Sequence, residues 1–163
     1  FELWNRELRL RRYLGTVAEV EALGRVGESA LAEGNFVQLQ LVSARLREIE
    51  QAELVPEDED EPIPLNLPLL QALGRSYEQV GAPEKSIGLY ELVLAEARLR
   101  EDAVQEEETL NNLARISLQA LDYPAAAPIY EKLLQLAIAR KDITNETLYL
   151  QQLAYIYDQM REI

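Results

Sequence analysis

The chain has 163 residues, no cysteine, no histidine and a formal net charge of −13, from 29 acidic and 16 basic side chains. This composition excludes disulfides, thiolate metal sites and any mechanism that needs an imidazole base. It also disfavours nucleic acid as a ligand, because binding to phosphates requires a basic surface.

The predicted elements are all helices. Long stretches rich in Ala, Leu, Glu, Gln and Arg, separated by single glycines and prolines, are typical of an all-α fold. We expect Gly15–Thr16 to separate the first two helices and Gly34–Asn35 to end the second. Helices are predicted over residues 2–14, 17–32, 36–53, 67–80, 83–101, 105–121, 124–140 and 145–160.

Residues 54–66 interrupt the helical pattern. This segment contains three prolines and five consecutive acidic residues at positions 57–61, so it cannot continue a helix. A cation site is the alternative interpretation, but consecutive acids lack the alternating spacing of a calcium loop. We therefore predict an exposed acidic loop inside a single domain.

A group of residues recurs with a period of 40. Leu70, Leu73 and Gly74 are repeated as Leu110, Leu113 and Ala114, and again as Leu150, Leu153 and Ala154. Tyr90, Glu91, Leu94, Ala97, Arg100 and Asp102 are repeated as Tyr130, Glu131, Leu134, Ala137, Arg140 and Asp142. Such a repeat predicts a solenoid of helical hairpins that share one core.

The segment LLQALGRSYEQVGAPEKSIGLY, residues 69–90, resembles the tetratricopeptide repeat (TPR). Leu70, Leu73-Gly74, Tyr77, Ser86 and Tyr90 supply the packing residues of that motif at its spacings. The resemblance implies an all-α, right-handed superhelical solenoid with about 3.5 repeats plus an N-terminal helix.

The repeat length points to one branch of this family. A period of 40 and the run Leu110-Asn111-Asn112-Leu113-Ala114 resemble the long-repeat subgroup typified by kinesin light chain. The N-terminal stretch FELWNRELRLRRYLG is also similar to cyanobacterial proteins of this class, which implies a bacterial source.

The resemblance divides a single domain, residues 1–163, into six parts. These are an N-terminal capping helix (1–15), a degenerate repeat (17–53), the acidic Pro-rich loop (54–66), two repeats (67–102 and 105–142) and a half repeat (145–163). Trp4 and Leu8 are expected to cap the first repeat, although an arginine-rich first helix could instead lie on an anionic membrane. The half repeat is expected to expose Leu150, Leu153, Ala154 and Tyr157.

In this family the first helix of each hairpin lines a concave groove, so its polar residues that point away from the core are candidates for partner binding. They are Gln71, Arg75, Glu78, Gln79, Asn111, Asn112, Arg115, Gln119, Gln151, Tyr155 and Asp158. Amides suit a peptide backbone, and Arg75 and Arg115 could pair with a carboxylate. Plain solvation of these side chains is the alternative. The carboxylate clamp of chaperone-binding relatives is rejected, because Gly24, Glu28 and Glu108 stand at three of its positions.

We therefore predict a non-enzymatic scaffold that binds a peptide or partner protein in the groove, with no catalytic residue, cofactor or metal. The alternative is a self-association module that dimerises through its end helices. Neither the partner nor the compartment follows from the sequence. Because the chain begins with Phe1 rather than Met, we expect a fragment of a longer or processed protein.

Overall fold

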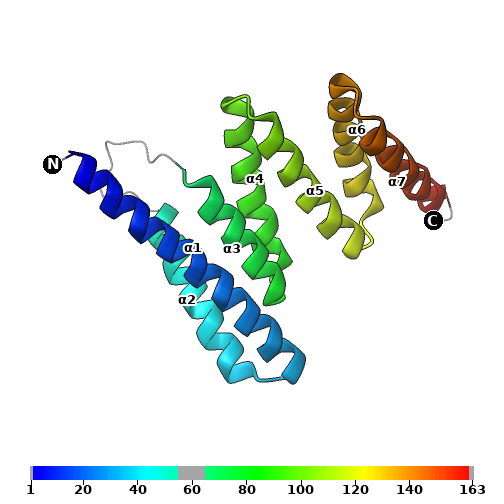
Figure 1. The fold of residues 1–163 in the computed structure, drawn as a ribbon. Coiled ribbons are helices and arrows are strands. Elements are labelled where there is room, and N and C mark those ends of the chain that lie inside the picture. The colour runs from blue at the N-terminus through cyan, green and yellow to red at the C-terminus, as the bar shows by residue number, and fades with distance from the viewer. Residues whose placement is uncertain (1, 55–64, 162–163) are drawn as a thin grey trace. The chain divides into compact units, whose positions relative to one another are not determined.

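The computed structural model describes residues 2–54 and 65–161, and for residues 2–15 it describes the backbone alone. These residues form seven helices and no strand, which confirms the all-α prediction (Figure 1). The helices are α1 (Glu2–Glu33), α2 (Phe36–Leu54), α3 (Leu67–Gln79), α4 (Pro83–Leu99), α5 (Ala103–Gln119), α6 (Tyr123–Arg140) and α7 (Ile143–Arg161). The chain forms two compact units, residues 1–89 (the N-terminal unit) and residues 90–163 (the C-terminal unit).

In the N-terminal unit, α1 packs against both α2 and α3. The seam between α1 and α3 is tight, because Gly24 presents no side chain there. The Ser76 hydroxyl on α3 donates a hydrogen bond of 2.8 Å to the carbonyl oxygen of Val20 on α1. Leu46, Leu70 and Leu73 are fully buried in the core of this unit.

In the C-terminal unit, α6 packs against α5 on one side and α7 on the other. Their apolar faces form one cluster that consists of Leu110, Ala114, Tyr123, Ala126, Ala127, Tyr130, Leu133, Ala137, Tyr149, Leu153 and Ile156. Leu94 of α4 is partly buried against the same cluster. Five of these residues, Leu110, Ala114, Tyr130, Ala137 and Leu153, are members of the sequence repeat, so these repeat residues pack in the core.

Short turns join consecutive helices, apart from α2 and α3, and each turn contains one residue with a left-handed backbone conformation. In the C-terminal unit these residues are Glu101, Leu121 and Lys141, with φ values of 54°, 57° and 58°. The residue that follows each of them donates its N–H to a carbonyl five residues earlier, at 2.9 Å in all three turns. This is the Schellman pattern that satisfies the last carbonyls of a helix.

The same following residue also begins the next helix. The side chains of Asp102, Asp122 and Asp142 accept the backbone N–H groups three residues further on, at 3.0, 3.1 and 3.2 Å. One aspartate thus closes one helix through its backbone and caps the next through its carboxylate. Because so few residues connect them, consecutive helices are held antiparallel.

Several predicted helix boundaries are wrong, and α5 spans Ala103–Gln119 where the sequence predicts residues 105–121. α1 runs without a break through Gly15–Thr16, because one glycine costs only about 1 kcal/mol relative to alanine within a long run of helix formers. α7 begins at Ile143 and not at residue 145, since Asp142 caps it. The acidic loop and the capping contacts of Trp4 and Leu8 fall outside the described residues and side chains. That the whole chain forms a single domain stays a prediction.

Two matched glycine substitutions test the seam between α1 and α3. A Cβ at Gly24 would lie 2.6 Å from the Ser76 Oγ and 3.1 Å from the Ser76 Cα, whereas a Cβ at Gly88 on α4 would meet nothing within 4 Å. We expect Gly24→Ala to lower the free energy of unfolding by about 1–3 kcal/mol and Gly88→Ala to raise it by about 1 kcal/mol. Urea denaturation measures both, and a similar gain in the two variants would contradict the tight seam.

The left-handed turn residues give a second test of stability. Leu121 is 67% exposed and loses no packing when it is shortened, but its backbone strains any residue with a Cβ. We expect Leu121→Gly to raise the free energy of unfolding by about 1 kcal/mol. Leu99→Gly, at an exposed position with helical backbone, serves as the control and should lower it. Thermal denaturation of the two variants would show shifts of opposite sign.

Candidate functional site

An open cleft of about 580 Å³ lies between α5 and α7 in the C-terminal unit. Its lining residues are Asn111, Asn112, Arg115, Leu118, Gln119, Tyr130, Leu148, Tyr149 and Gln152. The volume is in the range of clefts that hold ligands. Four of the predicted partner-binding residues, Asn111, Asn112, Arg115 and Gln119, therefore come together on one wall.

The lining of this cleft contrasts with the acidic composition of the chain. Arg115 is the one charged residue among those that line it, and none of them carries a carboxylate. The remaining polar groups are the side-chain amides of Asn111, Asn112, Gln119 and Gln152. Leu118 and Leu148 add apolar surface, and Leu148 is 46% exposed. The cleft thus combines amides, one cation and apolar walls.

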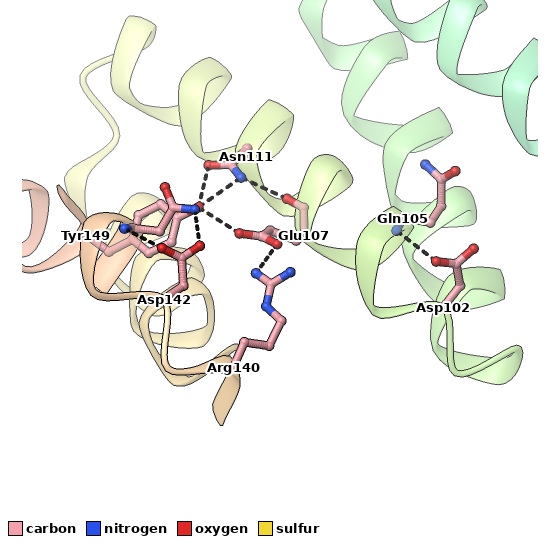
Figure 2. Close-up of polar contacts among 8 residues, drawn as sticks. Asp102, Gln105, Glu107, Asn111, Arg140, Asp142 and Tyr149 are labelled. Atoms are coloured by element: carbon pink, nitrogen blue, oxygen red, sulfur yellow. Dashed lines mark hydrogen bonds and ion pairs between the residues drawn. The ribbon is translucent and has the colours of Figure 1, made fainter. Parts of the chain in front are cut away.

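A polar network holds one end of the cleft in place (Figure 2). The Tyr149 hydroxyl donates to the Glu107 Oε1 at 3.1 Å, and the Asn111 Nδ2 donates to that hydroxyl at 3.2 Å and to the Glu107 carbonyl oxygen at 3.0 Å. The guanidinium of Arg140, at the end of α6, forms an ion pair with the same carboxylate. The network links α5, α6 and α7 and orients the amide of Asn111.

The pKa shifts in this network follow from burial and hydrogen bonding. Burial raises the pKa of the Tyr149 phenol above its ordinary value. The hydrogen bond to Glu107 raises the pKa of the Arg140 guanidinium. Both groups keep their protons at neutral pH, so the phenol remains a donor and the guanidinium a cation.

Sequence reasoning missed Glu107, Arg140 and Tyr149, along with the cleft residues Leu118, Tyr130, Leu148 and Gln152. The repeat drew attention to positions that match between copies, whereas Tyr149 departs from them. The corresponding residues in the other repeats are Leu69 and Thr109. A tyrosine at this position was the available signal that the seam between α5 and α7 differs from the others.

The predicted residues of the N-terminal unit have other surroundings. Arg75 and Gln79 line a smaller cleft of about 300 Å³ between α1 and α3, together with Glu21, Arg25, Ala72 and Ser76. There the Arg75 Nη2 lies 3.5 Å from the Glu21 Oε1, and the Gln79 Nε2 donates to the Glu28 Oε2 at 3.3 Å. Acidic residues of α1 thus already engage these two candidates.

Five predicted residues line neither cleft. Gln71 is only 4% exposed, so the expectation that it points away from the core is wrong: it follows Leu70 on a helix that is buried nearly all round. Glu78 is half-buried on α3, and Gln151 and Asp158 are exposed on α7. Tyr155 packs edge-to-face on Tyr123, with ring centroids 6.1 Å apart.

Neither a metal centre nor a membrane span is found in the parts of the chain that the structure describes. Among the described side chains, those of residues 16–54 and 65–161, no group of three or more acidic residues is arranged to hold a metal ion. No helix among them is both long and apolar enough to cross a bilayer.

Two stretches of the chain, residues 69–104 and residues 109–144, each match the family model of the tetratricopeptide repeat. These two segments are thus similar to tetratricopeptide repeats. The first covers most of α3 and all of α4, and the second covers most of α5 and all of α6. A comparison with curated proteins and with solved structures found no match. Tetratricopeptide repeats generally mediate interactions between proteins, and proteins built from them are typically non-enzymatic scaffolds.

The network around Glu107 can be tested by removal of one hydroxyl. We expect Tyr149→Phe to lower the free energy of unfolding at pH 7 by about 1 kcal/mol, because it deletes the hydrogen bonds to Glu107 and Asn111. The raised pKa of Tyr149 in the folded state means that its contribution is complete below about pH 10 and is lost as the pH rises further. The decline of stability at alkaline pH should therefore be less steep in this variant.

The control for this experiment is Tyr155→Phe, at a residue that is 50% exposed and whose hydroxyl lies at a long 3.5 Å from the hydroxyl of Tyr123. Its free energy of unfolding should stay within about 0.5 kcal/mol of the wild type at pH 7. Urea denaturation at several pH values measures both variants. Equal losses in the two would show that the Glu107 network does not stabilise the fold.

Proposed function

We propose that the chain is a non-enzymatic scaffold whose cleft between α5 and α7 binds an extended segment of a partner protein. The observation that carries this proposal is the lining of the cleft: four side-chain amides, one guanidinium and apolar walls, with no carboxylate among them. The two tetratricopeptide repeats support a protein partner over a small metabolite.

The chemistry of the lining indicates what the segment contains. Each amide offers a donor and an acceptor, which suits the main chain of an extended peptide. Leu118 and Leu148 can accept an apolar side chain, and Arg115 can pair with a carboxylate. We therefore propose a partner segment that places an apolar residue close to an acidic one.

The larger cleft is a better candidate than the one between α1 and α3. Arg75 occupies the same repeat position as Arg115, but it already pairs with Glu21, and a ligand would have to displace that carboxylate. Arg115 donates to the neutral Asn112 Oδ1 at 3.4 Å, in a lining that contains no carboxylate.

Two finer predictions remain part of this proposal. We assign the repeats to the long-repeat subgroup typified by kinesin light chain because of the period of 40 and the Asn111-Asn112 pair. A bacterial source is inferred from the N-terminal stretch. Self-association through the end helices is the alternative function, but two copies that each carry a charge of −13 repel each other, which favours a foreign partner.

Substitution of the cleft residues tests this function. We expect Asn112→Ala and Arg115→Ala each to weaken peptide binding at least tenfold, because each removes a polar group that contacts the ligand. The melting temperature should stay unchanged, since Asn112 is half-buried and Arg115 is exposed. Peptides selected on the wild type from a random display library serve as the ligands, and calorimetry measures their affinity.

The matched control is Arg75→Ala, at the equivalent position of the preceding repeat. It should leave the affinity for these peptides within a factor of two of the wild type. Wild-type affinity in both cleft variants would show that the peptides bind elsewhere.

A further inference from the structure

The side-chain amide of Asn111 has one nitrogen end and one oxygen end, and its neighbours decide which end a ligand can use (Figure 2). The Asn111 Nδ2 donates to the Glu107 carbonyl oxygen at 3.0 Å. A carbonyl oxygen only accepts hydrogen bonds, so the nitrogen end of the amide must point toward it. If the amide were turned by half a rotation, two oxygens would meet and neither could donate. This contact therefore fixes the orientation of the amide.

The phenol of Tyr149 engages the second N–H of the same amide. Burial raises the pKa of this phenol, so it keeps its one proton at neutral pH. The proton goes to the Glu107 Oε1 at 3.1 Å rather than to the Asn111 Oδ1 at 3.5 Å, because the carboxylate is nearer and charged. The phenolic oxygen is then an acceptor, and the Asn111 Nδ2 donates to it at 3.2 Å. Both N–H groups of the amide are thus engaged within the protein.

An ion pair outside the lining of the cleft supports this arrangement. The guanidinium of Arg140 pairs with the carboxylate of Glu107 and holds it where it accepts from Tyr149. Asn111 and Tyr149 line the cleft, whereas Glu107 and Arg140 do not. What Asn111 has left to offer a ligand in the cleft is the oxygen of its amide.

We propose that Asn111 recognises a ligand through its oxygen alone, and that Tyr149 is the positioning residue that imposes this choice. The inference rests on the function proposed for the cleft and specifies it. An extended partner segment must place an N–H, and not a carbonyl oxygen, opposite the Asn111 Oδ1. An asparagine with a free amide would accept either polarity, because it offers both a donor and an acceptor.

The donor that fits this position is a backbone N–H of the partner. Asn111 is half-buried, so an uncharged N–H reaches its oxygen at a lower desolvation cost than the ammonium group of a lysine. Proline has no N–H and is therefore excluded at the partner residue that faces Asn111. The hydrogen-bond network thus sets both the polarity and one sequence restriction of the bound segment.

One test needs no ligand. Nuclear magnetic resonance of the full chain, labelled with nitrogen-15, measures how fast side-chain amide protons exchange with solvent. We expect the Asn111 amide protons to exchange about tenfold more slowly than those of Gln151, which is exposed on α7. Tyr149→Phe should remove most of this protection, because it removes one acceptor, whereas Tyr155→Phe should leave it unchanged. Equally fast exchange of the two amides in the wild type would overturn the proposal.

A second test uses peptides that a random display library yields on the wild-type chain. Each backbone amide of a peptide is replaced in turn by an ester, which removes one N–H with little change of shape. We expect one ester to weaken binding to the wild type about tenfold and to have no such effect on Asn111→Ala, which lacks the acceptor. The same ester should keep its effect in Asn112→Ala, the matched control. In Tyr149→Phe its effect should fall to about twofold, because the released N–H of Asn111 can turn toward the ester.

This inference and the function proposed for the cleft fail in different ways. Peptides that depend on Asn112 and Arg115, but show no ester effect coupled to Asn111, would overturn the inference alone. An ester effect of the same size in Tyr149→Phe as in the wild type would also overturn it. Peptides that bind both Asn112→Ala and Arg115→Ala as tightly as the wild type would contradict the proposed function, and recognition by Asn111 with it.

Discussion

The close crossing of two helices at a small residue is the constraint on which the rest of this structure depends. A single amphipathic helix cannot bury its apolar face alone, so each hairpin needs a partner helix at short range. Gly74 and Ser86 provide that contact between α3 and α4, and Ala114 and Ala126 provide it between α5 and α6. The short capped turns assist by holding consecutive helices antiparallel, so that the small residues meet.

The residue that follows the first leucine of the repeat differs between the two seams that join neighbouring hairpins. Gly24 on α1 and Asn111 on α5 each follow the first leucine of their repeats, so they occupy equivalent positions. Gly24 allows α3 to approach closely, whereas Asn111 meets the ring of Tyr149 and forms hydrogen bonds with it. A cleft of about 300 Å³ lies between α1 and α3, and a cleft of about 580 Å³ lies beside Asn111. The seam with the larger side chain thus leaves the larger cleft.

The fold was predictable because its determinants are local and repeated. Spacing of Leu, Gly or Ala and Tyr identified the hairpins, and Gly81 and Pro83 located a turn correctly. One failure arises where a residue has two roles. Asp142 closes α6 through its backbone N–H and caps α7 through its carboxylate, so the predicted start of the last helix at residue 145 is too late. The site was only partly predictable for a related reason. Repeat register placed Asn111, Asn112, Arg115 and Gln119 on one wall, but the opposite wall depends on Tyr149, which the repeat does not contain.

The distribution of charge connects these features to binding. Acidic residues outnumber basic ones by 29 to 16, yet several are engaged where the fold needs them, as caps at Asp102, Asp122 and Asp142 and as ion pairs at Glu21 and Glu107. The lining of the larger cleft is free of carboxylates and includes the guanidinium of Arg115. The net negative charge of the chain attracts a basic partner and repels an acidic one at long range, whereas Arg115 attracts a carboxylate at short range. A partner that is basic overall, with one acidic residue in the bound segment, satisfies both.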